Sequence, residues 1–206
     1  MTLLEPGIFY HIYNRGINGC NIFRTRNNYR HFLRLHQKYI DPIAETFAWA
    51  LLKNHFHLLV RIKNEPEINL ASLPVPTNIN SFQSEERTLK KFHLYFSDFF
   101  NSYAKAYNKQ EGRTGSLFER PFRRIHVDDS NYFTNLVVYI HNNPAHHGFT
   151  DDFREYPWSS YGTILSIEPS RIQRDKVIGW FNGKGEFVST HKKLSYTEPF
   201  DKYIIE

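Results

Sequence analysis

Short runs of aromatic and β-branched residues, bounded by Gly, Pro, Asn or Asp, predict four β-strands along the chain. The second and third runs are separated by Lys53 and Asn54 alone, so we expect them to form a β-hairpin, although Lys-Asn is not the favoured turn pair. The predicted strands cover residues 8–14, 46–52, 55–62 and 122–127.

Two segments carry apolar residues three and four positions apart, which is the spacing of one helix face. The first is residues 26–40, and it is followed by Asp41-Pro42, a pair that ends helices. The second is residues 85–108, along which Phe and Tyr form a stripe. An aromatic stripe at this spacing is far more often core than a ligand platform, so we expect it to be buried.

Prolines and polar residues interrupt this pattern after the third strand. Residues 64–84 contain three prolines and many Asn and Ser, which predicts an inserted loop. A third helix is expected to start at Asp128-Asp129-Ser130, because acidic groups favour the positive end of the helix dipole. It is expected to stop before Pro144.

The resulting order of strand, helix, strand, strand, helix, strand is that of a ferredoxin-like fold, a split βαβ repeat on an antiparallel sheet. The fold class is therefore α+β, with the third strand central and paired with the first, and with a further helix after the fourth strand. We assign residues 1–150 to this domain, the 64–84 insertion included, and residues 151–206 to a C-terminal helical appendage.

The charge favours a polyanionic partner. The formal net charge is +5 and the isoelectric point is about 9.2, an excess suited to nucleic acid or to an anionic membrane surface. No apolar run approaches the roughly 20 residues of a membrane span, and we expect neither a signal peptide nor a membrane partner. Cys20 is the single cysteine, so no internal disulfide can form, and we expect a cytoplasmic protein.

The motif His55-Phe56-His57 is the first candidate for chemistry. Residues two apart in a strand point to the same face, so both imidazoles project together while Phe56 points away. Two adjacent imidazoles can hold one divalent ion and leave positions open for phosphate oxygens. A His-x-His pair among 11 histidines is by itself more often structural than a metal site.

A second candidate lies near the end of the third predicted helix. Tyr139 and Asn143 are four residues apart and share one helix face. A tyrosine hydroxyl, with a pKa of about 10, needs a polarised phosphate or a nearby base to act as a nucleophile. Asn143 offers an oxygen as a third metal ligand, and His141, on another face, ranks below it. One tyrosine among 13 proves nothing alone, and Asn before Pro commonly ends helices.

Basic residues form the third candidate, since phosphate contacts use such groups without sequence preference. The candidates for DNA contact are Arg15, Arg113, Arg120, Arg123 and Arg124. Further arginines lie near the first loop, at Arg24, Arg26 and Arg30. For each arginine, a role in phosphate binding and an ordinary place on the solvated surface are equally good interpretations.

The segments WALLKNHFHLLV and YIHNNP together resemble the single-tyrosine HUH transposases, in the branch associated with repetitive extragenic palindromes (REP). The segments YHIYNRG, IFRTRNNYRHFL, GSLFERPFRRIHV and YPWSSY resemble the same branch in the same order, from about residue 8 to residue 165. The similarity of each segment alone is weak, whereas the occurrence of all of them in the same order is specific to this family. The chain departs from many relatives by carrying NNP where they have LNP.

This resemblance implies that His55, His57 and Asn143 bind Mg²⁺ or Mn²⁺ and that Tyr139 attacks a DNA phosphate. The attack would leave a 5′-phosphotyrosine and a free 3′-hydroxyl. The expected partner is single-stranded DNA with hairpin elements, and residues 1–150 would be the catalytic domain.

Three other classes of protein stay open as interpretations of the sequence. The first is a domesticated, catalytically silent nucleic-acid-binding protein of the same fold, which the retained His, Tyr and Asn disfavour. The second is a replication initiator or relaxase, which we expect to need more than 206 residues. The third is a ferredoxin-like binding protein with chance histidines. A monomer is favoured, and a homodimer is possible if the tyrosine helix docks on a partner.

Overall fold

The computed structural model describes residues 3–74, 89–128 and 130–194. Residues 75–84 of the predicted 64–84 loop, the start of the predicted 85–108 helix and the last part of the C-terminal appendage therefore lie outside the described residues. No helix of the described ranges is both long and apolar enough to cross a membrane.

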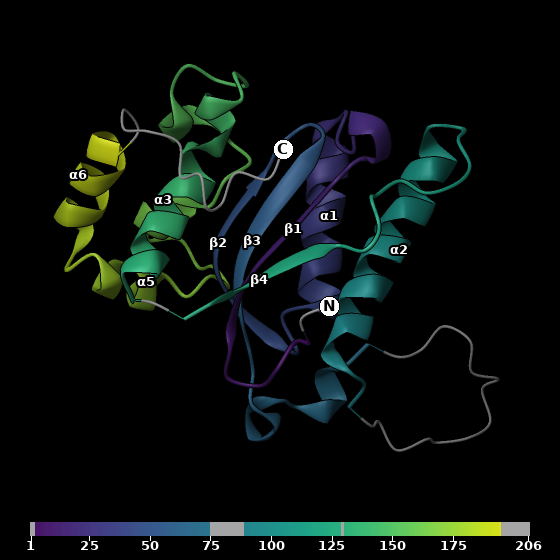
Figure 1. Ribbon diagram of the computed structural model, residues 1–206, viewed down its shortest axis with the longest axis horizontal. Coiled ribbons are helices and arrows are strands. Elements are labelled where there is room, and N and C mark those ends of the chain that lie inside the picture. Colours follow the sequence, from purple (N-terminus) through teal and green to yellow (C-terminus); the bar gives the residue numbers. More distant parts are fainter. Residues whose placement is uncertain (1–2, 75–88, 129, 195–206) are drawn as a thin grey trace.

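Four antiparallel strands form the sheet, as predicted, with β3 and β1 at its centre (Figure 1). The observed order β2-β3-β1-β4 confirms the ferredoxin-like α+β fold, with β2 and β4 at the sheet edges. The bounds of the third strand are the predicted ones, and those of the other strands differ by at most two residues. The strands are β1 (Phe9–Arg15), β2 (Ala44–Leu51), β3 (His55–Ile62) and β4 (Arg123–Val127).

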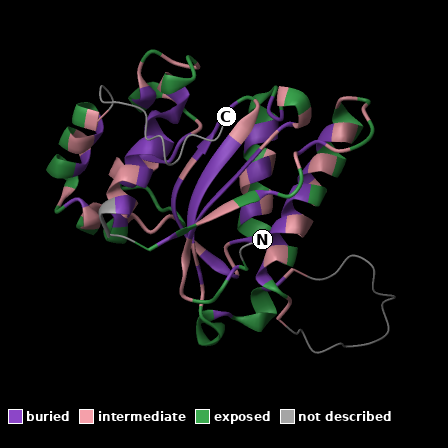
Figure 2. Ribbon diagram, viewed as in Figure 1, coloured by how far each residue is buried: buried purple, intermediate pink, exposed green. Residues whose placement is uncertain are grey.

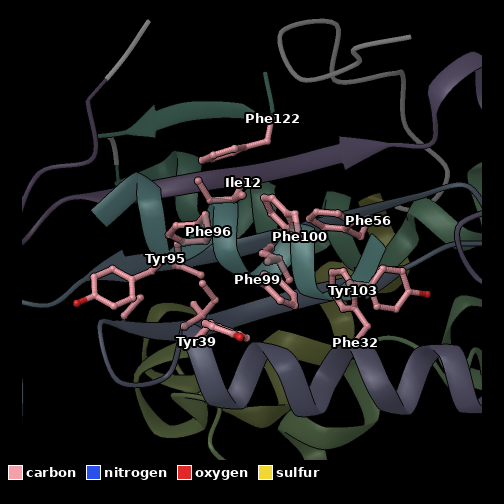
Figure 3. Packing of buried hydrophobic residues seen from close by; sticks show 14 of the residues in the cluster. Ile12, Phe32, Tyr39, Phe56, Tyr95, Phe96, Phe99, Phe100, Tyr103 and Phe122 are labelled. Atoms are coloured by element: carbon pink, nitrogen blue, oxygen red, sulfur yellow. The ribbon is translucent and has the colours of Figure 1, made fainter. Parts of the chain in front are cut away.

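One face of the sheet is covered by α1 (Arg26–Tyr39) and α2 (Phe92–Gln110) (Figure 1). The aromatic stripe of α2 is core, as expected, and it packs between α1 and the sheet (Figure 3). Phe32 of α1 touches Phe99 of α2 and Phe56 of β3, with ring centroids 4.6 and 4.9 Å apart. Helix α2 begins at Phe92 rather than at residue 85, after three described residues without helical structure.

The other face is covered by α3 (Ser130–His146), which lies against β2 and β3. Short helices of the C-terminal appendage pack beside α3 and join the same buried cluster. Figure 2 shows the central strands buried between the two helical layers. Within residues 151–194, the α-helices of the appendage are α4 (Tyr161–Leu165), α5 (Arg174–Trp180) and α6 (Lys184–Leu194).

The prediction that this helix stops before Pro144 is wrong, because α3 continues through Pro144 to His146. Pro144 has no backbone N–H to donate to the Ile140 carbonyl, so α3 lacks one hydrogen bond there, but the residues that follow continue the hydrogen bonding. The backbone N–H of His147 still donates to the Asn143 carbonyl at 3.1 Å, and that of Phe149 donates to the Pro144 carbonyl at 2.9 Å.

The predicted 64–84 loop contains two short 3-10 helices in its described part, Glu65–Glu67 and Leu70–Ser72. Asn64 and Glu67 form a reciprocal cap around the first of them. Polar residues that compete for backbone hydrogen bonds suit such single turns.

Candidate active site

The pleat of β3 separates its side chains between the two helical layers. His55 and His57 face α3, while Phe56 lies on the opposite face in the aromatic core (Figure 3). The two imidazoles are neighbours, with ring centroids 5.2 Å apart. The alternation predicted from the sequence thus holds in the fold, because strand side chains alternate strictly.

Helix α3 brings the second pair of predicted residues onto this face. The Tyr139 ring stands nearly perpendicular to the His57 ring, with centroids 5.5 Å apart. The Asn143 amide oxygen Oδ1 lies 3.0 Å from His55 Nε2. Four residues separated by up to 88 positions in sequence therefore meet at one point between β3 and α3.

Burial sets the charge state of this site. Desolvation lowers the pKa of His55 to about 4 and that of His57 well below its ordinary value, with neighbouring histidines acting in the same direction. Both imidazoles are therefore neutral near pH 7 and carry a free lone pair. Burial also raises the pKa of Tyr139 to about 12, against the opposing effect of a hydrogen bond from the Asn143 side chain.

The hydrogen bonds of His55 test whether this site suits a cation. Its Nδ1 lies 2.7 Å from Asn54 Oδ1, and its Nε2 lies 3.0 Å from Asn143 Oδ1. A neutral imidazole has one N–H, so it can donate to only one of these oxygens. Its other nitrogen then faces the second oxygen with a lone pair on each side. With the N–H toward Asn54, the Nε2 and Asn143 lone pairs converge, which is the donor arrangement that a divalent cation satisfies.

The third proposed ligand, Asn143, is an amide rather than one of the common metal-binding residues His, Cys, Asp and Glu. Within the described ranges, no group of three or more His, Cys, Asp and Glu is placed to hold a metal ion. The set His55, His57 and Asn143 is two imidazoles and one amide oxygen, and it leaves further positions for phosphate or water.

Two histidines near the site were missed by the sequence analysis. His11 on β1 is fully buried, and its Nε2 lies 2.9 Å from His57 Nδ1. His147 lies just beyond α3, with its ring centroid 4.8 Å from that of His55. The period-two pattern of β1 puts His11 and Tyr13 on one face, but finding them beside His57 requires the pairing register of β1 with β3.

The candidate arginines divide between the two faces. Arg123 pairs across strands with Tyr13, which pairs with His57, so it shares the face of the site. Arg15 pairs with His55 and forms an ion pair with Glu119 at 3.1 Å. The sheet therefore brings these two arginines beside the histidines.

The other three candidates lie elsewhere. Arg124 pairs with Ile12 and lies over the Phe122 ring, 5.0 Å from its centroid, on the α2 side of the sheet. Arg113 donates to the Ser116 carbonyl at 3.2 Å, and Arg120 is exposed in the segment before β4. Arg124 therefore lies on the sheet face away from the histidines.

His141 lies on another face of α3, as expected, and is enclosed by hydrogen bonds. His191 Nδ1 donates to the Phe187 carbonyl at 2.7 Å, so His191 Nε2 accepts from His141 Nδ1 at 2.8 Å. His141 Nε2 then accepts from Ser160 Oγ at 2.8 Å. This chain joins α3, α6 and the segment before α4, and it leaves no lone pair of His141 for a metal.

Comparison with known proteins agrees with this architecture. No family model matches the chain. A protein of Haemophilus influenzae named as a REP-associated tyrosine transposase is 25% identical over 125 residues, 60% of this chain. The chain thus spans 62% of the length of this curated relative. A solved REP-associated tyrosine transposase bound to a REP hairpin superposes with a TM-score of 0.55 at 16% identity, over 82% of this chain and 87% of that one. The chain is therefore similar, in sequence and in fold, to the REP-associated tyrosine transposases, which confirms the resemblance seen in its motifs.

Proposed function

We propose that the chain is a metal-dependent transposase of the single-tyrosine HUH type, which cuts and rejoins hairpin-containing single-stranded DNA. The observation that carries the proposal is the meeting of Tyr139, His57, His55 and Asn143 at one point. The similarity to a transposase whose solved structure holds a REP hairpin supports hairpin DNA as the partner.

In the proposed reaction, Tyr139 Oη attacks the scissile phosphorus and gives up its proton. The P–O3′ bond breaks, the 3′-oxygen takes up a proton, and the 5′-phosphate stays on Tyr139 as a phosphodiester. Attack by a second 3′-hydroxyl reverses these bond changes and joins a new strand. The energy of the cut is kept in the phosphotyrosine bond, so rejoining needs no nucleotide hydrolysis.

Tyr139 needs assistance, because its buried hydroxyl has a pKa of about 12. The Asn143 side chain, hydrogen-bonded to this hydroxyl, favours the phenolate. His55, His57 and Asn143 would hold Mg²⁺ or Mn²⁺ through neutral nitrogen and oxygen donors. A divalent cation bound there neutralises the phosphate and stabilises the charge that develops in the transition state.

Arg123 and Arg15 are proposed to bind phosphates that flank the cut, because both lie on the face of the histidines. Arg113, Arg120 and Arg124 are proposed to contact DNA farther from the cut. Residues 1–150 would form the catalytic domain and residues 151–206 an appendage. A monomer suffices in this scheme, since Tyr139 packs against histidines of its own chain.

The test uses labelled hairpin-bearing single-stranded DNA with Mn²⁺ and denaturing gels. We expect a covalent adduct for the native protein, none for Tyr139→Phe, and none after chelation of the metal. Tyr39→Phe, on the far side of the sheet, is the matched control and should form the adduct. DNA binding without adduct in every sample would instead favour the silent nucleic-acid-binding protein, and adduct in Tyr139→Phe would exclude this nucleophile.

A further inference from the structure

His11 has no part in the proposed reaction, yet it occupies a central place in the sheet. It lies in the middle of β1, on the face that carries His57, and it is fully buried. The rings of Tyr13 and Tyr139 lie beside it, with centroids 4.9 and 6.2 Å away. Strand pairing places Leu59 and Ile125 on either side of it.

A single hydrogen bond joins His11 Nε2 to His57 Nδ1, at 2.9 Å. Two neutral imidazoles share one proton in such a bond, so one ring donates and the other accepts. If His57 donates from Nδ1, its Nε2 carries a lone pair that can bind a cation. If His11 donates instead, the proton of His57 moves to Nε2 and blocks that position.

The second observation is the far side of the His11 ring. Its Nδ1 is buried and has no hydrogen-bond partner within the described part of the chain. When His11 accepts from His57, this nitrogen carries the N–H and remains unsatisfied. A buried, unsatisfied polar group destabilises a fold, and an aliphatic side chain of similar size would fill the same space without that cost.

We infer that His11 is a positioning residue for the metal site, which accepts a hydrogen bond from His57 Nδ1 and thereby presents His57 Nε2 to the cation. The inference rests on the proposed function. Hydrogen bonds from a ligating imidazole to a neighbouring acceptor generally fix its orientation and tautomer and raise its basicity. Here the acceptor is a second histidine on the adjacent strand, so strand pairing itself holds the ring in place.

Two substitutions separate this role from simple packing. His11→Leu keeps an apolar side chain of similar size and removes the acceptor. His11→Gln restores an acceptor, because its amide oxygen reaches the position of Nε2. His126→Leu is the matched control, since His126 is exposed on β4 and pairs with Tyr10, on the opposite face.

Mn²⁺ binding is measured by isothermal titration calorimetry on the DNA-free proteins, and folding by thermal unfolding. We expect His11→Leu to bind Mn²⁺ about 10- to 100-fold more weakly, with an unfolding midpoint equal to or above that of the native protein. His11→Gln should stay within about threefold of the native affinity, and His126→Leu should match it. Native affinity in a folded His11→Leu overturns the inference.

Long-range ¹H–¹⁵N spectra of the metal-free native protein give an independent answer, and they decide the matter if His11→Leu fails to fold. A proton on His57 Nδ1 supports the inference, and a proton on His57 Nε2 overturns it. Failure of the proposed function looks different: the native protein would bind no Mn²⁺, and the positioning role would fall with the metal site.

Discussion

The buried chain of His191, His141 and Ser160 predicts a specific dependence of stability on pH. Desolvation lowers the pKa of His191 from its ordinary value near 6.5 to about 4, partly offset by its bond to the Phe187 carbonyl. The unfolded chain therefore binds a proton at this site at a higher pH than the folded chain does. The free energy of unfolding must fall as the pH drops from about 6.5 towards about 4, because the unfolded state takes up the proton first.

The size of the effect follows from the two pKa values. Their separation corresponds to roughly 3 kcal/mol of unfolding free energy, present in full above pH 6.5 and lost by about pH 4. His191→Gln removes the titration but keeps an acceptor for His141 Nδ1. It loses the bond to the Phe187 carbonyl and some packing, so it should be about 1 to 3 kcal/mol less stable than the native protein near pH 7.

The assay is urea unfolding followed by circular dichroism at several pH values, with the native protein and His191→Gln side by side. The other buried histidines titrate in both proteins, but His141 contacts His191, so the difference between the two curves reports His191 together with its effect on His141. We expect that difference to shrink by about 2 to 3 kcal/mol between about pH 7 and pH 4.5, and even to change sign. A difference that stays constant over this range would refute the assignment of His191 as a buried neutral group.

Three further outcomes follow from the geometry. Asn143→Leu should weaken Mn²⁺ binding at least about 10-fold in calorimetry, because the amide oxygen facing His55 is lost; unchanged affinity would remove Asn143 from the ligand set. Arg123→Gln should weaken binding of hairpin DNA irrespective of its sequence, and it should reduce the slope of log K against log salt concentration by about 1 in filter-binding assays. Arg124→Gln, on the other face of the sheet, should have a smaller effect in the same assays. Gly16→Ala should lower the unfolding free energy in urea by about 1 to 3 kcal/mol, because its Cβ would lie 2.0 Å from the Cys20 carbonyl oxygen; native stability would mean that this loop adapts freely.

The sheet and the histidine pair were predictable because they depend on strict local periods. Alternation along a strand has no freedom, so the shared face of His55 and His57 follows from their spacing of two. The shared face of Tyr139 and Asn143 follows equally from a spacing of four in a helix. The order of elements then restricts the topology to a few alternatives, of which the observed one is the ferredoxin-like order.

What the sequence could not supply is the register between distant strands. His11 contacts His57 because β1 pairs with β3 in one particular register, and a shift by one residue would turn His11 to the other face. Alternation already puts Arg123 and Arg124 on opposite faces, but only the register shows that Arg123 is the one on the face of His57. The end of α3 was misjudged because proline commonly ends a helix, whereas here the backbone N–H groups after Pro144 still bond to the Asn143 and Pro144 carbonyls and the helix runs on to His146.

In the proposed reaction, the phenol of Tyr139 becomes bonded to DNA beside His55 and His57. The direct measurement is peptide mapping by mass spectrometry of the protein after reaction with hairpin-bearing single-stranded DNA and Mn²⁺, followed by nuclease digestion. We predict a nucleotide attached to the peptide that contains Tyr139, and its disappearance in His57→Ala. A nucleotide on Tyr13, whose ring also lies against His57, or on any residue in the absence of divalent metal, would contradict it.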